Sequence, residues 1–563
     1  MSDQRYDASE TAVVATSAAA VVGRSPRVGY VPVRANRVRD GVAIALLVVA
    51  LLLPWNLDFG LGVPGSDGSL FLLVIVVTVL AILAALMPHV GPFRLTAADE
   101  NVRRTSRVRL LLGIPYYVIA AGFVLYQIRE TWNNGGTGLV APGVGPGLLL
   151  GLGGAALASQ PPITSVTLED NGFRRSYAAA RTLGVLSIVL ATLSVAFNLY
   201  WRLRYLFLSN EGFSSQDVAV IITTLLYGAV AMIALVIASR WLIERTAAAR
   251  LATTALGASG ALAATLVWLL PIGRDVDAFH GIAENTSTAA VGYEGYLFWA
   301  AAAALVAPTT LYAIFLIKPP TLGAYRVAAE KCLTLIAFWA FSAAGLRVVD
   351  YVIAWSLDLP KALYDTVAMT AFNVVTGFIA RWLHRQLVRG ESALTVIAAF
   401  SGLLFVFTVA NLAIGVALAP RYAEPSPTTF YGNNLAQQIT STFDVTVCAL
   451  SFAVLIAMLF TGPLAAWVIR RRETAPAPAA AQLSGPEPFA PPTLARSSQP
   501  TSQPISQPVS QPSSLPRIVR LKEDSTTVLP AETADPTAAL RIRRRERSSE
   551  PTIGLSTPPP TND

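Results

Sequence analysis

The chain has 563 residues, of which 53% are hydrophobic and only 13% are charged, about half the charged share of soluble domains. Its 42 basic residues exceed its 34 acidic ones, but most arginines lie beside long apolar segments, so the excess positive charge indicates a membrane protein rather than a nucleic-acid-binding one. This composition excludes a soluble multidomain protein and predicts an all-α polytopic membrane protein.

The chain begins with a polar, Ala-rich arm, residues 1–40, in which we expect no ordered structure. The arm lacks the apolar core and cleavage site of a secretory signal peptide. We therefore expect it to remain in the cytoplasm.

Apolar segments long enough to cross about 30 Å of hydrocarbon follow, since a crossing takes about 20 residues. The expected spans are 41–57, 70–90, 109–128, 139–158, 181–200, 217–239, 251–272, 296–317, 332–356, 362–383, 394–419 and 443–469. The fourth contains two prolines and many glycines, so it either spans fully or is re-entrant, and its glycines predict close helix packing. The sequence predicts twelve transmembrane helices, with ten or eleven as the alternative.

The basic residues predict the orientation of these spans. Arginines cluster in the loops after the second, fourth, sixth and tenth spans and directly after the last one, whereas the first loop has no basic residue. Because positively charged loops remain on the cytoplasmic side, both termini are expected to be cytoplasmic, in the plasma membrane.

The first and seventh spans end alike, with LLPWNLD at Leu52–Asp58 and LLPIGRD at Leu269–Asp275. This likeness predicts two six-helix halves, 41–240 and 251–470, as parallel repeats occur in secondary transporters. The alternative is coincidence, since Leu and Pro are common near helix ends.

Charged residues inside the ninth and tenth spans are the leading candidates for a functional site. The ninth helix must continue through Arg347 and Asp350 to cross the bilayer, and these two residues share a face. The tenth span begins near Asp365 and carries Asn373. In a transporter this cluster would be the charged floor of an outward-facing cavity that binds a proton, an ion or a polar headgroup. In the structural alternative the cluster is an ion pair that holds the two helices together, and Asn373 forms a hydrogen bond between helices.

Motifs of known enzyme classes are missing from the sequence, and its Cys and His residues lack metal-ligand spacing. We therefore expect no cofactor and no metal site. Asp58 and Asp67 in the first outer loop resemble the carboxylates that membrane glycosyltransferases using lipid-linked sugars carry in that loop. That resemblance implies a glycosyltransferase of the cell envelope, although the loop is shorter than in those enzymes.

The last segment, 473–563, contains a Ser-Gln-Pro repeat and is expected to be a disordered cytoplasmic tail. Five arginines near its end are expected to contact anionic lipid. They are Arg541, Arg543, Arg544, Arg545 and Arg547.

Thr11, Thr527 and Thr552 follow acidic residues and precede aliphatic ones, which resembles the sites of actinobacterial Ser/Thr kinases. A kinase and a cytoplasmic adaptor are thus candidate partners, besides the lipid bilayer.

The helical region resembles uncharacterised multi-pass membrane proteins of actinobacteria. It shares with them the Arg-rich, Lys-poor usage, the loop PWNLDFGLGVPGSDG at Pro54–Gly68 and the Pro/Ser/Gln-rich tail. The resemblance implies a cell-envelope setting and no activity. Three functions remain open. The first is transport of a small or lipid-linked solute, the second is a non-catalytic scaffold that recruits partners through its tail, and the third is the glycosyltransferase.

Overall fold

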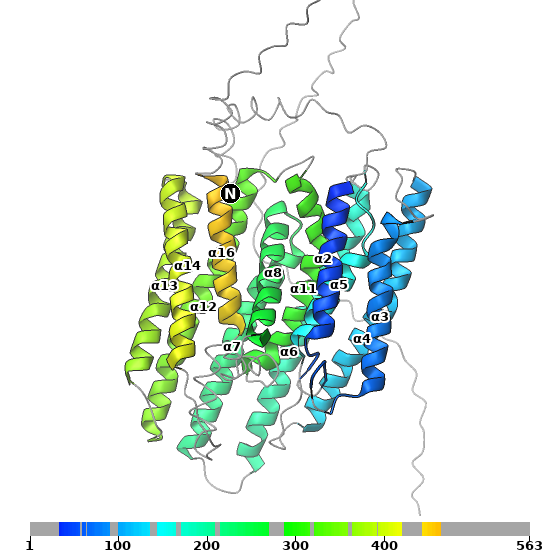
Figure 1. The fold of residues 1–563 in the computed structure, drawn as a ribbon. Coiled ribbons are helices and arrows are strands. Elements are labelled where there is room, and N and C mark those ends of the chain that lie inside the picture. The colour runs from blue at the N-terminus through cyan, green and yellow to red at the C-terminus, as the bar shows by residue number, and fades with distance from the viewer. Residues whose placement is uncertain are drawn as a thin grey trace, which may run out of the picture. The chain divides into compact units, whose positions relative to one another are not determined.

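A computed structural model shows helices packed side by side (Figure 1). It describes residues 33–56, 59–63, 65–90, 99–134, 144–164, 170–208, 214–269, 287–315, 320–358, 363–390, 392–418 and 442–462. All of them belong to one compact unit, Met1–Ala479. Within the described residues, the regular secondary structure consists of twelve α-helices and one 3-10 turn.

Each predicted span coincides with one of these helices, so the all-α prediction is confirmed. The helices are α2 (Val33–Leu52), α3 (Gly68–Leu86), α4 (Asp99–Asn134), α5 (Pro146–Ser159), α6 (Asp170–Leu208), α7 (Ser215–Ile243), α8 (Ala247–Leu269), α11 (Ser287–Phe315), α12 (Leu322–Ser356), α13 (Leu363–Arg389), α14 (Leu394–Leu418) and α16 (Thr442–Thr461). The 3-10 turn η1 (Met87–His89) directly follows α3.

Eight of the described helices are long and apolar enough to cross a membrane: α3, α4, α6, α7, α12, α13, α14 and α16. The other four, α2, α5, α8 and α11, pack on one another in the middle of the bundle (Figure 1). There α2 packs on α5, α5 on α11, and α11 on α8.

Local caps explain where several helices begin. The Asp67 carboxylate accepts the backbone N–H groups of Ser69 and Leu70, which starts α3 two residues earlier than the predicted span. Ser214 and Asp217 form a capping box at the start of α7. These caps satisfy N–H groups that would otherwise lack partners at the helix ends.

The apolar core consists of two main clusters. One is built mainly from α2 to α5 and contains Trp55, Tyr116 and Phe123. The other is built from α6, α7, α8, α12, α13, α14 and α16, and α11 contributes to both. The clusters are groups of packed side chains and mark no boundary along the chain, so the predicted six-helix halves and their sequence repeat stay a prediction.

Helix α5 is the exception among the predicted spans, because its 14 residues cover only about 21 Å at 1.5 Å per residue. Beyond Ser159 the chain continues in extended conformation through Gln160, and residues 160–164 are almost entirely buried. The predicted fourth span is therefore described as a short helix followed by buried, non-helical chain, and both alternatives, a full span and a re-entrant segment, stay open.

Glycines allow α5 to pack this closely, as predicted. A methyl group on Gly151 would lie 1.7 Å from the hydroxyl oxygen of Tyr116, and one on Gly154 would lie 2.8 Å from Cγ of Leu47. A methyl group on Gly147 would lie 2.5 Å from the carbonyl oxygen of Leu53. Residues with a side chain at these positions would push α5 away from α2 and α4.

Candidate functional site

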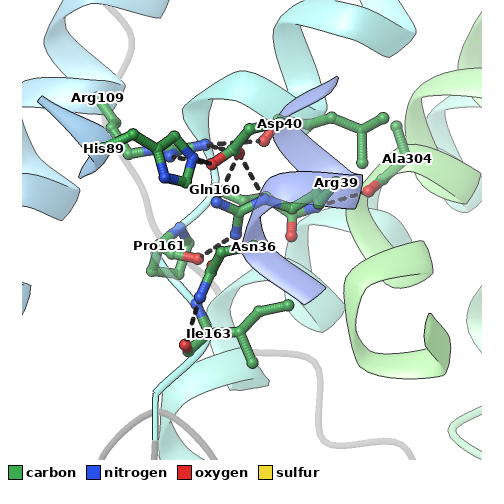
Figure 2. Close-up of polar contacts among 10 residues, drawn as sticks. Asn36, Arg39, Asp40, His89, Arg109, Gln160, Pro161, Ile163 and Ala304 are labelled. Carbon is green, nitrogen blue, oxygen red and sulfur yellow. Dashed lines mark hydrogen bonds and ion pairs between the residues drawn. The ribbon is translucent and has the colours of Figure 1, made fainter. Parts of the chain in front are cut away.

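A buried ionic network surrounds Asp40, near the start of α2 (Figure 2). Arg39 donates from Nε and Nη2 to Oδ1 of Asp40, at 2.9 and 2.7 Å. Arg109 of α4 donates from Nη2 to Oδ1 at 2.8 Å and from Nη1 to Oδ2 at 3.3 Å. The Asp40 side chain is 2% exposed and both arginine side chains are 0% exposed. We call these residues, together with His89, the Asp40 network.

His89, the last residue of η1, connects this network to the protein surface. Its Nε2 lies 2.9 Å from Oδ2 of Asp40, and its side chain is 25% exposed. Because Asp40 is paired with two guanidinium groups, its carboxylate acts as an acceptor, so we assign the proton of this contact to His89 Nε2. His89 is the network's most accessible side chain.

Arg39 of this network and its neighbour Asn36 hold the chain that follows α5. The Asn36 side chain donates to the Ile163 carbonyl at 2.8 Å and accepts the Ile163 N–H at 2.9 Å. Arg39 Nη1 donates to the Pro161 carbonyl at 2.8 Å, and the Gln160 amide donates to the Ala304 carbonyl of α11 at 2.6 Å. Non-helical backbone at membrane depth must be buried in protein or line a cavity. Here polar side chains from α2 supply the hydrogen bonds that a helix would supply internally.

The Asp40 network has a formal charge of +1 when His89 is neutral, since it contains two guanidinium groups and one carboxylate. Arg109 Nη2 also donates to the Leu157 carbonyl in the last turn of α5, at 3.4 Å. The negative end of the α5 dipole offsets part of this charge. A buried charge without a full partner costs several kcal/mol, so the excess calls for an explanation.

The sequence did not single out this network. Arg39 belongs to the arginines that flank the first span, and Asp40 precedes the apolar stretch, so both fitted the positive-inside pattern. His89 and Arg109 come from other predicted spans. The available signal was Asp40 itself, an acidic residue directly before a span and next to an arginine.

The structure places Arg347 and Asp350 of the predicted site between α7, α12 and α16. Tyr227 of α7 donates its hydroxyl to Oδ2 of Asp350 at 2.9 Å. Asp444 of α16 accepts the indole N–H of Trp339 at 2.6 Å and lies within electrostatic range of Arg347. Oδ1 of Asp350 and Nε of Arg347 are buried without a hydrogen-bond partner. The Asp365 side chain lies outside the described residues.

Asn373 lies elsewhere, at the contact between α13 and α14. Asn411 of α14 donates to Oδ1 of Asn373 at 3.3 Å, and Asn373 donates to the Met369 carbonyl at 3.0 Å. This hydrogen bond between helices agrees with the structural interpretation of Asn373.

Asp67, one of the two carboxylates of the glycosyltransferase hypothesis, caps α3. Hydrogen bonds from the Ser69 hydroxyl and from the Ser69 and Leu70 N–H groups stabilise its ionised form and lower the pKa of Asp67. A general acid needs the opposite shift. Asp58, like the tail arginines and the three candidate threonines, lies outside the described residues.

Within the described residues, no three His, Cys, Asp or Glu side chains gather in a way that could hold a metal ion. Cys332 and Cys448 are free thiols.

Comparison with known proteins gives one match. The model of a family described as a domain of unknown function (DUF7937) matches residues 36–463, which is more than half of the chain. No curated protein and no solved structure matches. The match begins at Asn36, so it includes every residue of the Asp40 network.

Proposed function

The chain belongs to the DUF7937 family, whose domain has no known function, and we propose that it transports a small or lipid-linked solute across the membrane. Its multi-pass helical architecture provides the scaffold for such a function. One observation supports the proposal: α5 ends after 14 residues, and the ionisable side chains of Arg39 and Arg109 donate to backbone carbonyls at that end.

Broken crossings have a specific meaning in transporters. Secondary transporters bind substrates and coupling ions where a transmembrane helix is interrupted, because the freed backbone groups and helix ends can contact the ligand. In this chain α5 ends at Ser159, and Arg39 and Arg109 donate to backbone carbonyls at that end. An ionisable residue inside a membrane costs roughly 2.5–3.5 kcal/mol, so such residues generally mark a path or a coupling site.

We further propose that the protein lies in the plasma membrane with both termini in the cytoplasm, in a cell envelope of the actinobacterial type. The arginine clusters support this orientation. It puts the Asp40 network on the cytoplasmic side and Arg347 and Asp350 in the outer half of α12. A reporter fused after residue 472 should then be cytoplasmic and one inserted near Thr428 extracytoplasmic. Reporters on the same side would refute the orientation.

Within this proposal the Asp40 network acts as a cytoplasmic gate. It joins α2, α4 and η1 through the Asp40 carboxylate, and Arg109 connects it to the end of α5. A solute that moves past the end of α5 has to separate Asp40 from at least one of the two arginines. Arg347 and Asp350, in the outer half of α12, remain a second proposed solute-binding site on the transport path. The tail arginines and a Ser/Thr kinase remain proposed contacts of the cytoplasmic tail.

The scaffold is the competing function. A scaffold needs the Asp40 network only to fasten helices, so a variant that folds should keep its full function. A transporter needs the network to open and close, so a folded variant should lose flux.

Transport can be tested without knowing the solute. Liposomes containing the purified full-length chain are loaded with a small-molecule extract of the producing cells, and efflux is followed by mass spectrometry. At least one solute should leave these liposomes faster than it leaves protein-free ones. Asp40→Asn should abolish this difference, Asp40→Glu should reduce it, and the exposed control Glu100→Gln should preserve it.

Two results would refute the proposal. In one, no solute leaves faster than from protein-free liposomes. In the other, folded Asp40→Asn protein transports as fast as the wild type. Fluorescence-detected size exclusion of each variant shows whether it is folded before loading.

A further inference from the structure

The face of α4 that carries Arg109 has buried donors without partners. Nε of Arg109 and the hydroxyl of Thr105 are both buried and have no hydrogen-bond partner. Thr105 precedes Arg109 by four residues, so the two side chains lie one turn apart on the same face. Both residues are 0% exposed.

We propose that this face binds an oxyanion, the carboxylate or phosphate group of the transported solute. The inference rests on the proposed transport function and names the chemical class of its substrate. Thr105 and Arg109 Nε are the donors, and Arg39 adds a second positive charge across Asp40.

The charge of the network requires such a ligand. Among the described residues, Asp40 is the only carboxylate within ion-pair distance of Arg39 or Arg109. One positive charge therefore remains buried, and an anion would neutralise it. A water molecule could satisfy the two donors but would leave the charge in place.

The guanidinium geometry leaves one donor of Arg109, its Nε–H, free for a second acceptor. Arg109 presents its Nη1 and Nη2 end to the Asp40 carboxylate. Because the guanidinium group is planar with five donors in a fixed fork, Nε–H points away from Asp40. An oxyanion there would not have to displace Asp40 in order to bind.

The face continues along α4 as a polar seam covered by α5. Buried residues recur at Thr105, Arg109, Gly113 and Tyr116, and a methyl group on Gly113 would lie 2.0 Å from the Ser159 hydroxyl oxygen of α5. The hydroxyl of Tyr116 is also buried without a partner. The same face of α4 therefore carries a further unpaired hydroxyl besides Thr105 and Arg109 Nε.

The binding test uses the full-length protein in detergent and in phosphatidylcholine nanodiscs. Sodium phosphate and sodium acetate are titrated against sodium chloride at constant ionic strength, and the melting temperature is measured. A ligand that binds only the folded state raises the melting temperature in a saturable manner. We expect this with phosphate or acetate but not with chloride.

Thr105→Val is the diagnostic variant. It keeps the shape of the side chain and removes only an unpaired buried hydroxyl, so the protein should fold at least as stably as the wild type. Its dissociation constant for the anion should rise at least tenfold. Thr182→Val is the matched control, because Thr182 is exposed and donates within its own helix to the Ala178 carbonyl.

A second arm tests whether the oxyanion belongs to a free solute or to a lipid. In nanodiscs containing phosphatidylglycerol, a bound headgroup should stabilise the protein without phosphate, and Thr105→Val should remove that effect. Phosphate or acetate binding in phosphatidylcholine alone indicates a free solute. Equal effects of all three salts, or an unchanged response of Thr105→Val, would overturn the proposal and indicate a site filled by water only.

These outcomes are separable from those of the transport test. Anion binding without efflux of any solute would refute transport and leave the site standing. Efflux that persists in Thr105→Val, together with no anion binding, would refute the site and leave transport standing.

Discussion

Replacing Asp40 with Asn tests whether one carboxylate holds α2, α4 and η1 together. The exchange keeps the size of the side chain but removes the negative charge between Arg39 and Arg109, whose side chains are 0% exposed. Removing one partner of a buried ion pair costs about 3–5 kcal/mol, because the remaining charge stays buried. At about 1.4 kcal/mol per tenfold, the ratio of folded to unfolded protein should fall about 100- to 5,000-fold.

Equilibrium unfolding in mixed micelles of dodecyl maltoside and SDS, followed by tryptophan fluorescence, measures this loss. Asp67→Asn is the matched control, since Asn caps a helix about as well as Asp and that side chain is exposed. Its effect on stability should be small, because the capping hydrogen bonds are kept and the side chain is exposed. Adding Arg109→Gln to Asp40→Asn removes one of the two guanidinium charges left without a carboxylate and should recover about 1 kcal/mol or more, since residues in one network couple by roughly 0.5–3 kcal/mol.

Two results would contradict this reasoning. If Asp40→Asn costs no more than Asp67→Asn, the Asp40 carboxylate does not compensate the two arginines. If Arg109→Gln adds its own loss without any recovery, excess positive charge is not the cause of the instability.

Two further substitutions test the packing and the outer cluster. Gly151→Ala places a methyl group 1.7 Å from the hydroxyl oxygen of the buried tyrosine that packs there, and should cost about 1–3 kcal/mol in the same assay. Gly260→Ala is the control, because no heavy atom of another segment lies within 4 Å of the new methyl group, and it should stabilise α8 by up to about 1 kcal/mol. Equal effects of the two substitutions would refute the packing argument. Tyr227→Phe removes the donor to Asp350 and should cost about 1–3 kcal/mol, whereas the exposed control Tyr126→Phe should change stability little.

Hydropathy predicted the number of helices because each of them contains an apolar stretch. It was least accurate for α5, where the predicted span 139–158 became a helix at Pro146–Ser159 followed by extended chain. The side chains that satisfy this extended chain come from Asn36 and Arg39, more than a hundred residues earlier. No local pattern near α5 indicates them.

Side-chain partners were harder to predict than helices. The pair Arg347 and Asp350 was found because an apolar stretch was too short, which is a local property. Their partners Tyr227 and Asp444 lie on α7 and α16, and only the packing of these helices on α12 brings them together. The expected contact with Asp365 rested on chain proximity alone and stays a prediction.

The incomplete pairing of the Asp40 network bears on the choice between transporter and scaffold. An ionic clamp that only fastens helices works best when neutral and fully hydrogen-bonded, since apolar residues of similar volume often stabilise as well or better. The network instead keeps a surplus guanidinium charge, and Arg109 Nε and Thr105 next to it lack partners. Each of these features costs stability in the state that the structure shows. They become favourable if a negatively charged ligand occupies the site during part of the protein's cycle, which is what a transporter requires and a clamp does not.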